Sequence, residues 1–260
     1  MKSLDKKFTI QDIKDFKSAK TPFVTLTAYD YVSAQICDDA NIPLILVGDS
    51  ASMTIYGYNT TIPVSMEEML LVVKAVVRGT KKSLVVADMP FLSYQTSVED
   101  TILNAGIFIK DGGAGAVKLE GGQHIAKHIE ALVNIGVPVL GHVGLTPQSY
   151  HQLSGYSIQG KTPSEAQKII DDAKVVQDAG AFGVVLECIP ENLAQKITHS
   201  LTIPTIGIGS GMRCDGQIQV YHDIMGLSKS SAPKHAKQYE NLYQTMLNAV
   251  KKYKKDIENA

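Results

Sequence analysis

The feature that most constrains the fold is a repeated pattern of short apolar runs, each ending at a titratable residue. Leu44–Ser50 reads LILVGDS, Leu84–Asp88 reads LVVAD, and Ala116–Gly122 reads AVKLEGG. Val137–His142 and Val184–Glu187 follow the same pattern, with VPVLGH and VVLE. Runs of this length and composition predict buried strands. Active-site groups lie at the carboxyl ends of the parallel strands of a (β/α)8 barrel, so five such runs favour that fold.

The run from Ala116 shows how the pattern carries chemistry. In an extended segment alternate side chains point the same way, so Lys118 and Glu120 share one face and Val117 and Leu119 share the other. Burying a lysine and a glutamate at the end of an apolar strand costs free energy unless they pair with other groups or take part in a functional site. Taken alone, this run leaves a purely structural ion pair as an equal alternative.

Strand-like and helix-like segments alternate along the whole chain, which predicts a parallel α/β fold. The length of 260 residues is close to the ~250 that are typical of one (β/α)8 TIM barrel. We therefore predict a single barrel domain over residues 1–260, with a short N-terminal helix, Thr9–Lys20, covering its closed end. The expected strands are Phe23–Thr27, Leu44–Gly48, Ser83–Asp88, Ala116–Gly122, Val137–His142, Phe182–Glu187, Thr205–Ile208 and Gln217–Tyr221.

Two connections are too long for simple turns between a strand and a helix. Residues 49–63 follow the second expected strand, and residues 144–161, rich in Gly, Ser and Tyr, follow the fifth. Long loops at this end of a barrel often carry function. We expect the second loop to act as a lid, and the tail from about Lys234 to be helical.

Composition excludes several classes of partner. The formal net charge is −1, so there is no global electrostatic case for binding nucleic acid or an anionic membrane. No apolar run approaches the ~20 residues needed to cross a bilayer. The N-terminal sequence MKSLDKKF has no apolar core and does not resemble a signal peptide. The three cysteines lack paired spacing, which suits a reducing cytosol.

Three carboxylates are expected to converge at the mouth of the barrel. Asp49, Asp88 and Glu120 end the second, third and fourth strands, and these strand ends are neighbours in a barrel. Such a cluster is repulsive unless a cation lies among the acids, and hard oxygen ligands suit Mg²⁺. The alternative is a metal-free acid cluster with raised pKa values.

Three further side chains complete the candidate site. Lys118 can form a Schiff base or stay charged and hold a substrate oxygen, and the neighbouring acids favour the charged form. Glu187, from the sixth strand, is suited to act as a general base. His142 is suited to hydrogen-bond a substrate oxygen. The alternative is a structural histidine whose ring hydrogen-bonds only to the backbone of a loop.

Taken together, these motifs resemble the ketopantoate hydroxymethyltransferase (3-methyl-2-oxobutanoate hydroxymethyltransferase) family. The resemblance runs from about residue 21 to residue 237, in the same order along the chain. The pairing of KLEGG with GHVGLTPQS is the most specific part. The motifs are GDS at 48–50, ADMPF at 87–91, VKLEGG at 117–122, GHVGLTPQS at 141–149, LECIP at 186–190, GIGSG at 207–211 and DGQ at 215–217.

The resemblance implies a Mg²⁺-dependent enzyme of pantothenate synthesis. Such an enzyme moves a hydroxymethyl group from 5,10-methylenetetrahydrofolate to 3-methyl-2-oxobutanoate, giving 2-dehydropantoate. It also implies a cytoplasmic homo-oligomer, often a decamer. By motif, Glu187 would be the proton acceptor. Asp49, Asp88 and Glu120 would hold the metal, and Asp49, Ser50, Asp88 and Lys118 would contact the 2-oxoacid.

Two other functions fit part of the pattern. A Mg²⁺-dependent carbon–carbon lyase of the isocitrate lyase type would share the acids and the metal. It would be expected to carry a catalytic cysteine in its lid loop, and residues 144–161 contain none. A non-catalytic binding protein on the same barrel would have no need of a base opposite the acid cluster.

Overall fold

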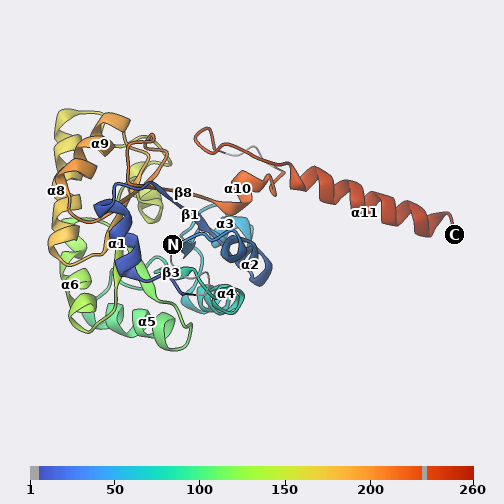
Figure 1. Cartoon of the computed structure of the whole chain (residues 1–260), viewed down its shortest axis with the longest axis horizontal. Coiled ribbons are helices and arrows are strands. Elements are labelled where there is room, and N and C mark those ends of the chain that lie inside the picture. Colours follow the sequence, from blue (N-terminus) through green and yellow to red (C-terminus); the bar gives the residue numbers. More distant parts are fainter. Residues whose placement is uncertain (1–5, 230–232) are drawn as a thin grey trace. The chain divides into compact units, whose positions relative to one another are not determined.

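The computed structural model describes residues 6–229 and 233–260. Eight parallel strands close into a barrel in the order of the chain, which confirms the predicted (β/α)8 TIM barrel. Helices α4, α5, α6, α8 and α9 surround the strands (Figure 1). The strands are β1 (Phe23–Thr27), β2 (Leu44–Val47), β3 (Leu84–Asp88), β4 (Ala116–Glu120), β5 (Val139–Gly144), β6 (Gly183–Glu187), β7 (Thr205–Ile208) and β8 (Gly216–Gln219).

The helices lie in the connections between the strands and at the two ends of the chain. The helices are α1 (Ile10–Ser18), α2 (Tyr31–Asp39), α3 (Ala51–Thr54), α4 (Met66–Gly79), α5 (Val98–Lys110), η1 (Gln123–Ile125), α6 (Ala126–Asn134), η2 (Pro147–Ser149), α7 (Tyr150–Leu153), α8 (Pro163–Asp178), α9 (Glu191–Ser200), α10 (Tyr221–Met225) and α11 (Leu242–Glu258).

The two-residue period of each strand separates the apolar core from the polar mouth. Val86, Leu140 and Val185 belong to one buried apolar cluster at the centre of the barrel. Two residues further along the same strands, Asp88 and His142 share that inward direction. The same alternation leads from Ala116 to Lys118 and Glu120 on β4. An apolar interior therefore turns into a titratable mouth at the carboxyl ends of the strands.

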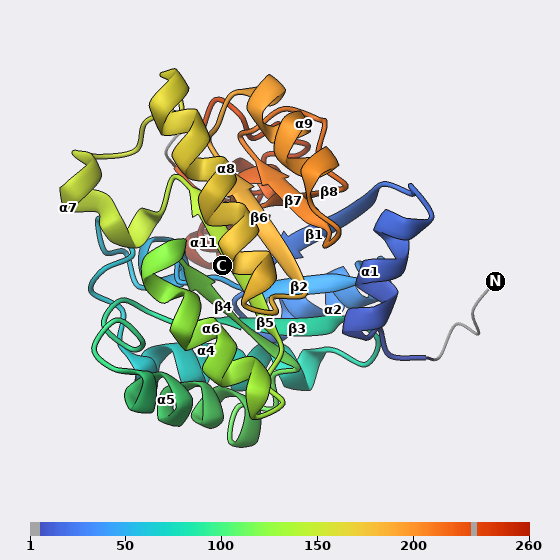
Figure 2. The same ribbon diagram turned by 90° about the vertical axis from the view of Figure 1, so that its left-hand side faces the viewer.

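Helix α1 closes the opposite end of the barrel, as expected for the N-terminal helix. Thr9 caps it, with its hydroxyl accepting from the backbone N–H of Asp12 while the Asp12 carboxylate accepts from Thr9 N–H. Ile13 is fully buried in the barrel cluster. The rings of Phe16 and Phe23 stack with centroids 5.1 Å apart. Figure 2 shows α1 and α7 at opposite ends of the barrel.

Several strand boundaries differ from the predicted ones by one or two residues, and two of these shifts have a clear physical reason. The fifth strand begins at Val139 and not at Val137, because Val137 N–H bonds to Leu132 O at the end of the preceding helix and Pro138 has no N–H to donate. The eighth strand ends at Gln219, because Tyr221 already begins the short helix α10. Neither shift moves an expected site residue off its strand end.

The two long loops contain local structure. Residues 49–63 include helix α3, and the loop ends where Ser65 caps α4. The cap is reciprocal: Ser65 Oγ accepts from Glu68 N–H at 3.2 Å, and Ser65 N–H donates to Glu68 Oε2 at 2.8 Å. Residues 144–161 contain η2 and α7. Closure of this second loop as a lid stays a prediction.

The chain divides into two compact units, residues up to 218 and residues 219–260. The second unit contains α10 and α11, joined by backbone hydrogen bonds from Tyr239 N–H to Ile224 O and from Tyr243 N–H to Gly226 O, both 2.8 Å. The expected helical tail begins at Leu242 and not near Lys234. A single domain over residues 1–260 stays a prediction. Within the part of the chain that the structure describes, no helix is long and apolar enough to cross a membrane.

Candidate active site

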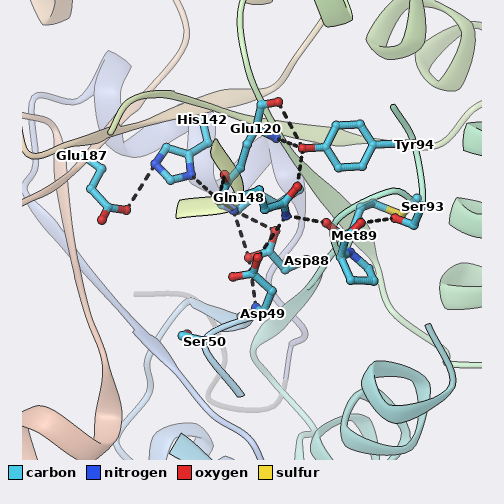
Figure 3. A network of polar contacts seen from close by, with 12 residues as sticks. Asp49, Ser50, Asp88, Met89, Ser93, Tyr94, Glu120, His142, Gln148 and Glu187 are labelled. Atoms are coloured by element: carbon cyan, nitrogen blue, oxygen red, sulfur yellow. Dashed lines mark hydrogen bonds and ion pairs between the residues drawn. The ribbon is translucent and has the colours of Figure 1, made fainter. Parts of the chain in front are cut away.

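The carboxyl ends of β2, β3 and β4 bring four buried charged side chains together (Figure 3). The register pairs Asp88 with Lys118 across β3 and β4, and Glu120 with His142 across β4 and β5. Asp49 follows β2, and its backbone N–H donates to Asp88 Oδ2 at 3.2 Å. Asp49, Asp88, Lys118 and Glu120 are each no more than 4% exposed. The structure thus brings the predicted acid cluster and the lysine into one site.

Lys118 lies between the acids of its own strand and of β3. Its Nζ donates to Asp88 Oδ1 at 2.7 Å and to Asp88 Oδ2 at 2.9 Å. The same nitrogen lies 3.3 Å from Glu120 Oε1, so Lys118 and Glu120 share one face of β4 as predicted. A buried ammonium in contact with two carboxylates is held both by charge and by hydrogen bonds.

The electrostatics of the cluster favour a charged lysine. Burial alone would lower the pKa of Lys118, but the charges of Asp88, Glu120 and Asp49 raise it above its usual value. Burial likewise opposes ionisation of Glu120, yet the Lys118 charge and the contact with His142 lower the pKa of Glu120 to about 2. This arrangement supports the electrostatic role for Lys118 over a Schiff base, which needs a neutral amine.

The other two acids are not fully compensated. Burial, together with the charges of Asp88 and Glu120, raises the pKa of Asp49 well above its ordinary value. Burial also raises the pKa of Asp88, although the Lys118 charge opposes that shift. Additional positive charge at the site would therefore favour the ionised forms of Asp49 and Asp88.

The donor set is suitable for a hard divalent cation, since carboxylate oxygens are the ligands that Mg²⁺ prefers. Across residues 6–229 and 233–260, however, no three or more His, Cys, Asp or Glu side chains are arranged as a ready-made metal site. The ammonium of Lys118 lies against Asp88 in this arrangement. Magnesium binding by Asp49, Asp88 and Glu120 therefore stays a prediction.

His142 lies between two carboxylates. Its Nδ1 is 3.4 Å from Glu120 Oε1, and its Nε2 is 3.2 Å from Glu187 Oε2. Both contacts lie outside good hydrogen-bond geometry, so charge attraction holds them. Burial and the Lys118 charge would lower the pKa of His142, but the two carboxylates raise it to about 9. The two carboxylates thus favour the protonated imidazole, which links the acid cluster to Glu187.

Glu187 approaches from the far side of the barrel mouth. It ends β6, four strands beyond the β2 that precedes Asp49. Its side chain is 17% exposed, against 2–3% for Asp88 and Glu120, so it lies at the solvent side of His142. Figure 3 shows Glu187 and the acid cluster on opposite sides of the imidazole. A carboxylate so placed can reach a substrate atom that the acid cluster does not contact.

Ser50 is positioned by a residue that the sequence did not single out. The hydroxyl groups of Ser50 and Tyr29 lie 2.7 Å apart. A Cβ on Gly48 would lie 2.8 Å from Ser50 Oγ, which explains the glycine of the GDS motif. Tyr29 lies in the short connection between β1 and α2. Its position just after a strand end is the one sequence signal that could have pointed to it as a site residue.

Sequence reasoning also missed two buried polar residues beneath the acid cluster, Tyr94 and Gln148. Tyr94 is fully buried, and Gln148 is 5% exposed. Gln148 belongs to the GHVGLTPQS motif, whose specificity could have indicated a structural role for it. Tyr94 lies in the loop after β3, where no spacing marks it.

Aromatic residues of the second long loop lie near the mouth. The rings of Tyr150 and Tyr156 pack edge to face with centroids 5.1 Å apart. Burial, and then the charge of Asp49, raises the pKa of Tyr156 to about 12. Tyr156 Oη also lies 3.9 Å from Met53 Sδ, in the first long loop. The two long loops therefore meet near the acid cluster.

Comparison with known proteins decides the family. The family model described as ketopantoate hydroxymethyltransferase matches residues 7–260. The chain belongs to this family. A 3-methyl-2-oxobutanoate hydroxymethyltransferase of Carboxydothermus hydrogenoformans is 53% identical over 249 residues, which are 96% of this chain and 90% of the relative. One of Geobacter metallireducens is 51% identical, over 96% of this chain and 94% of the relative. The chain is thus an enzyme of the hydroxymethyltransferase class.

Solved structures of low sequence identity share the barrel. A 2,3-dimethylmalate lyase, a member of the PEP mutase/isocitrate lyase superfamily, superposes with a TM-score of 0.65 at 15% identity, over 96% of this chain and 85% of the lyase. Phosphonopyruvate hydrolase in complex with oxalate and Mg²⁺ gives 0.63 at 12% identity, over 97% of this chain and 87% of the hydrolase. At these identities the likeness establishes the fold alone.

Proposed function

We propose that this enzyme transfers a hydroxymethyl group from 5,10-methylenetetrahydrofolate to 3-methyl-2-oxobutanoate, giving 2-dehydropantoate for pantothenate synthesis. The observation that carries the proposal is the pairing of a buried, lysine-bridged acid cluster with a separate carboxylate, Glu187, across the same barrel mouth. Relatives at about 50% identity named for this reaction support the choice of substrate.

Asp49, Asp88 and Glu120 are the proposed ligands of one Mg²⁺, because three buried carboxyl groups converge there and burial opposes the ionisation of Asp49 and Asp88 unless positive charge is added. When bound, the metal would polarise the 2-oxo group and offset the negative charge that develops on its oxygen. The remaining contacts to the 2-oxoacid are proposed from Ser50, Lys118 and His142.

The chain's own residues supply the proton chemistry. Carbon C3 of the 2-oxoacid must lose its proton before it can attack the one-carbon unit. Glu187 is the proposed acceptor, because it reaches the mouth from β6 and its side chain is open to the mouth. Lys118, held charged by the acids around it, stabilises negative charge on the substrate oxygen.

A cytoplasmic homo-oligomer, often decameric in this family, is part of the same proposal. Helix α11 supports self-association, since none of its residues is buried. Met246, Val250 and Ile257 recur along it at helical spacing and are 58–63% exposed. Analytical ultracentrifugation tests the proposal, and a monomer at micromolar concentration would contradict it.

The decisive experiment follows tetrahydrofolate release by the purified protein. With 3-methyl-2-oxobutanoate and 5,10-methylenetetrahydrofolate, release should depend on both substrates. EDTA should abolish it, and added Mg²⁺ should restore it. Full activity in metal-free buffer would refute the magnesium site, and failure to release tetrahydrofolate with Mg²⁺ present would refute the proposed reaction.

A further inference from the structure

Gln148 is a buried amide residue in direct contact with the acid cluster. It lies in the 3₁₀ turn η2 that opens the second long loop, and it is 5% exposed. Its amide makes two donated and two accepted hydrogen bonds. Nε2 donates to Asp49 Oδ2 at 3.0 Å and to Met89 O at 2.8 Å. Oε1 accepts from Tyr94 Oη and from Gln95 Nε2, both at 2.8 Å.

These partners allow only one orientation of the amide. Met89 O is a backbone carbonyl, which can only accept, so the amide nitrogen must face it. The amide oxygen then faces the other way, toward Tyr94 Oη and Gln95 Nε2. The Tyr94 hydroxyl is itself held in place, because it accepts from Glu120 N–H at 3.1 Å. Every hydrogen-bonding position of the Gln148 amide is therefore filled, with one N–H pointing at Asp49 Oδ2 and the other at Met89 O.

The backbone of Gln148 reaches a second acid. Its N–H donates to Glu120 Oε2 at 3.0 Å, on the carboxylate whose other oxygen contacts Lys118. Asp49 follows β2 and Glu120 ends β4, and these two strands are separated by β3. One residue thus contacts carboxylates from two strands that do not pair with each other (Figure 3).

We infer that Gln148 is a positioning residue, which fixes the Asp49 and Glu120 carboxylates in a shared orientation and ties the loop of residues 144–161 to the acid cluster. Charge-assisted hydrogen bonds to a carboxylate fix its rotation, and groups that hydrogen-bond to metal ligands govern how well those ligands bind. The expected effect of Gln148 on Mg²⁺ affinity rests on the proposed Mg²⁺ site. The expected effect on the orientation of the carboxylates does not depend on that site.

The alternative is that Gln148 merely anchors the loop. Two variants separate these roles. Gln148→Met keeps the length of the side chain and the backbone N–H but removes the amide. The control Thr101→Val removes a fully buried hydroxyl that donates to Tyr94 O at 2.9 Å. It therefore loosens the neighbouring loop after β3, whose Tyr94 hydroxyl contacts Gln148, without touching an acid.

Mg²⁺ titration calorimetry on the intact proteins gives the first readout. We expect Gln148→Met to bind Mg²⁺ about 10–100-fold more weakly than wild type, the usual effect of losing a partner of a metal ligand. Thr101→Val should bind Mg²⁺ like wild type although its melting temperature falls. If Gln148→Met does not fold, Gln148→Asn, whose amide is one methylene too short, takes its place. Wild-type affinity in the Gln148 variant, or an equal loss in Thr101→Val, overturns the inference.

Crystal structures of the metal-free proteins give a readout that does not depend on the metal. In the Gln148 variant the Asp49 carboxylate should rotate away from its wild-type orientation, whereas in Thr101→Val it should not. An unchanged orientation of Asp49 would overturn the inference even if magnesium bound more weakly. Should wild type bind no Mg²⁺, the proposed metal site fails, and these structures alone decide the role of Gln148.

Discussion

Replacing Lys118 by methionine removes the only ammonium in the acid cluster and keeps most of its apolar stem. Lys118 is 3% exposed and contacts both Asp88 and Glu120. Removing one partner of a buried ion pair costs about 3–5 kcal/mol, because the remaining charge is left buried and uncompensated. We therefore expect Lys118→Met to lower the free energy of unfolding by that amount at pH 7 without metal. Urea unfolding followed by circular dichroism measures it.

Magnesium should reverse much of this loss if the cluster binds a cation, because ligand binding to the folded state stabilises it. Lys17→Met is the matched control, since Lys17 belongs to α1, at the closed end of the barrel, and pairs with Asp215 at 2.8 Å. Its loss of stability should not respond to Mg²⁺. A loss below about 1 kcal/mol in Lys118→Met, typical of exposed pairs, would refute the claim that Lys118 holds the acids together.

Three further predictions concern the base, a distant acid and a glycine. Glu187→Gln should slow exchange of the substrate C3 proton in deuterium oxide, followed by NMR, by about 10²–10⁴-fold; wild-type exchange would mean that Glu187 is not the base. Burial opposes ionisation of Asp38, but the backbone N–H groups of residues 81–83 lower its pKa below 3.8. Asp38→Asn should therefore destabilise the protein at pH 7 by an amount that shrinks as the pH falls below about 4, and a pH-independent difference would contradict this. Gly144→Ala should lower the free energy of unfolding, measured by thermal unfolding, by about 1–3 kcal/mol, because φ is +97° and a Cβ would lie 2.4 Å from Glu187 O. Wild-type stability of this variant would show that the backbone at the end of β5 can shift to accommodate a Cβ.

The barrel and its acid cluster could be predicted because both depend on local pattern. Apolar runs with a two-residue period specify strands, and the residue that ends each run must lie at the mouth of a parallel barrel. This pattern alone predicts that Asp88, Lys118, Glu120 and Glu187 lie at the mouth. Strand ends next to proline or a short helix, as at Val137, could not be located, because the competing hydrogen bonds come from neighbouring helices.

The residues that support the cluster could not be predicted in the same way. Gln148 and Tyr94 are 54 positions apart, and they meet only because the loops after β3 and β5 fold over the same strand ends. The contact of His142 with Glu187 depends likewise on the closeness of β5 and β6. No spacing within one segment encodes such contacts, so they require the three-dimensional fold.

The most direct test of the account follows the carbon that is transferred. The purified protein is given Mg²⁺, 3-methyl-2-oxobutanoate and 5,10-methylenetetrahydrofolate labelled with ¹³C in the one-carbon unit. The account predicts a ¹³C-labelled hydroxymethyl group bonded to a C3 that carries no proton, with one tetrahydrofolate released for each product molecule. Label that stays on the folate, or a 2-oxoacid that is cleaved instead of extended, would contradict it.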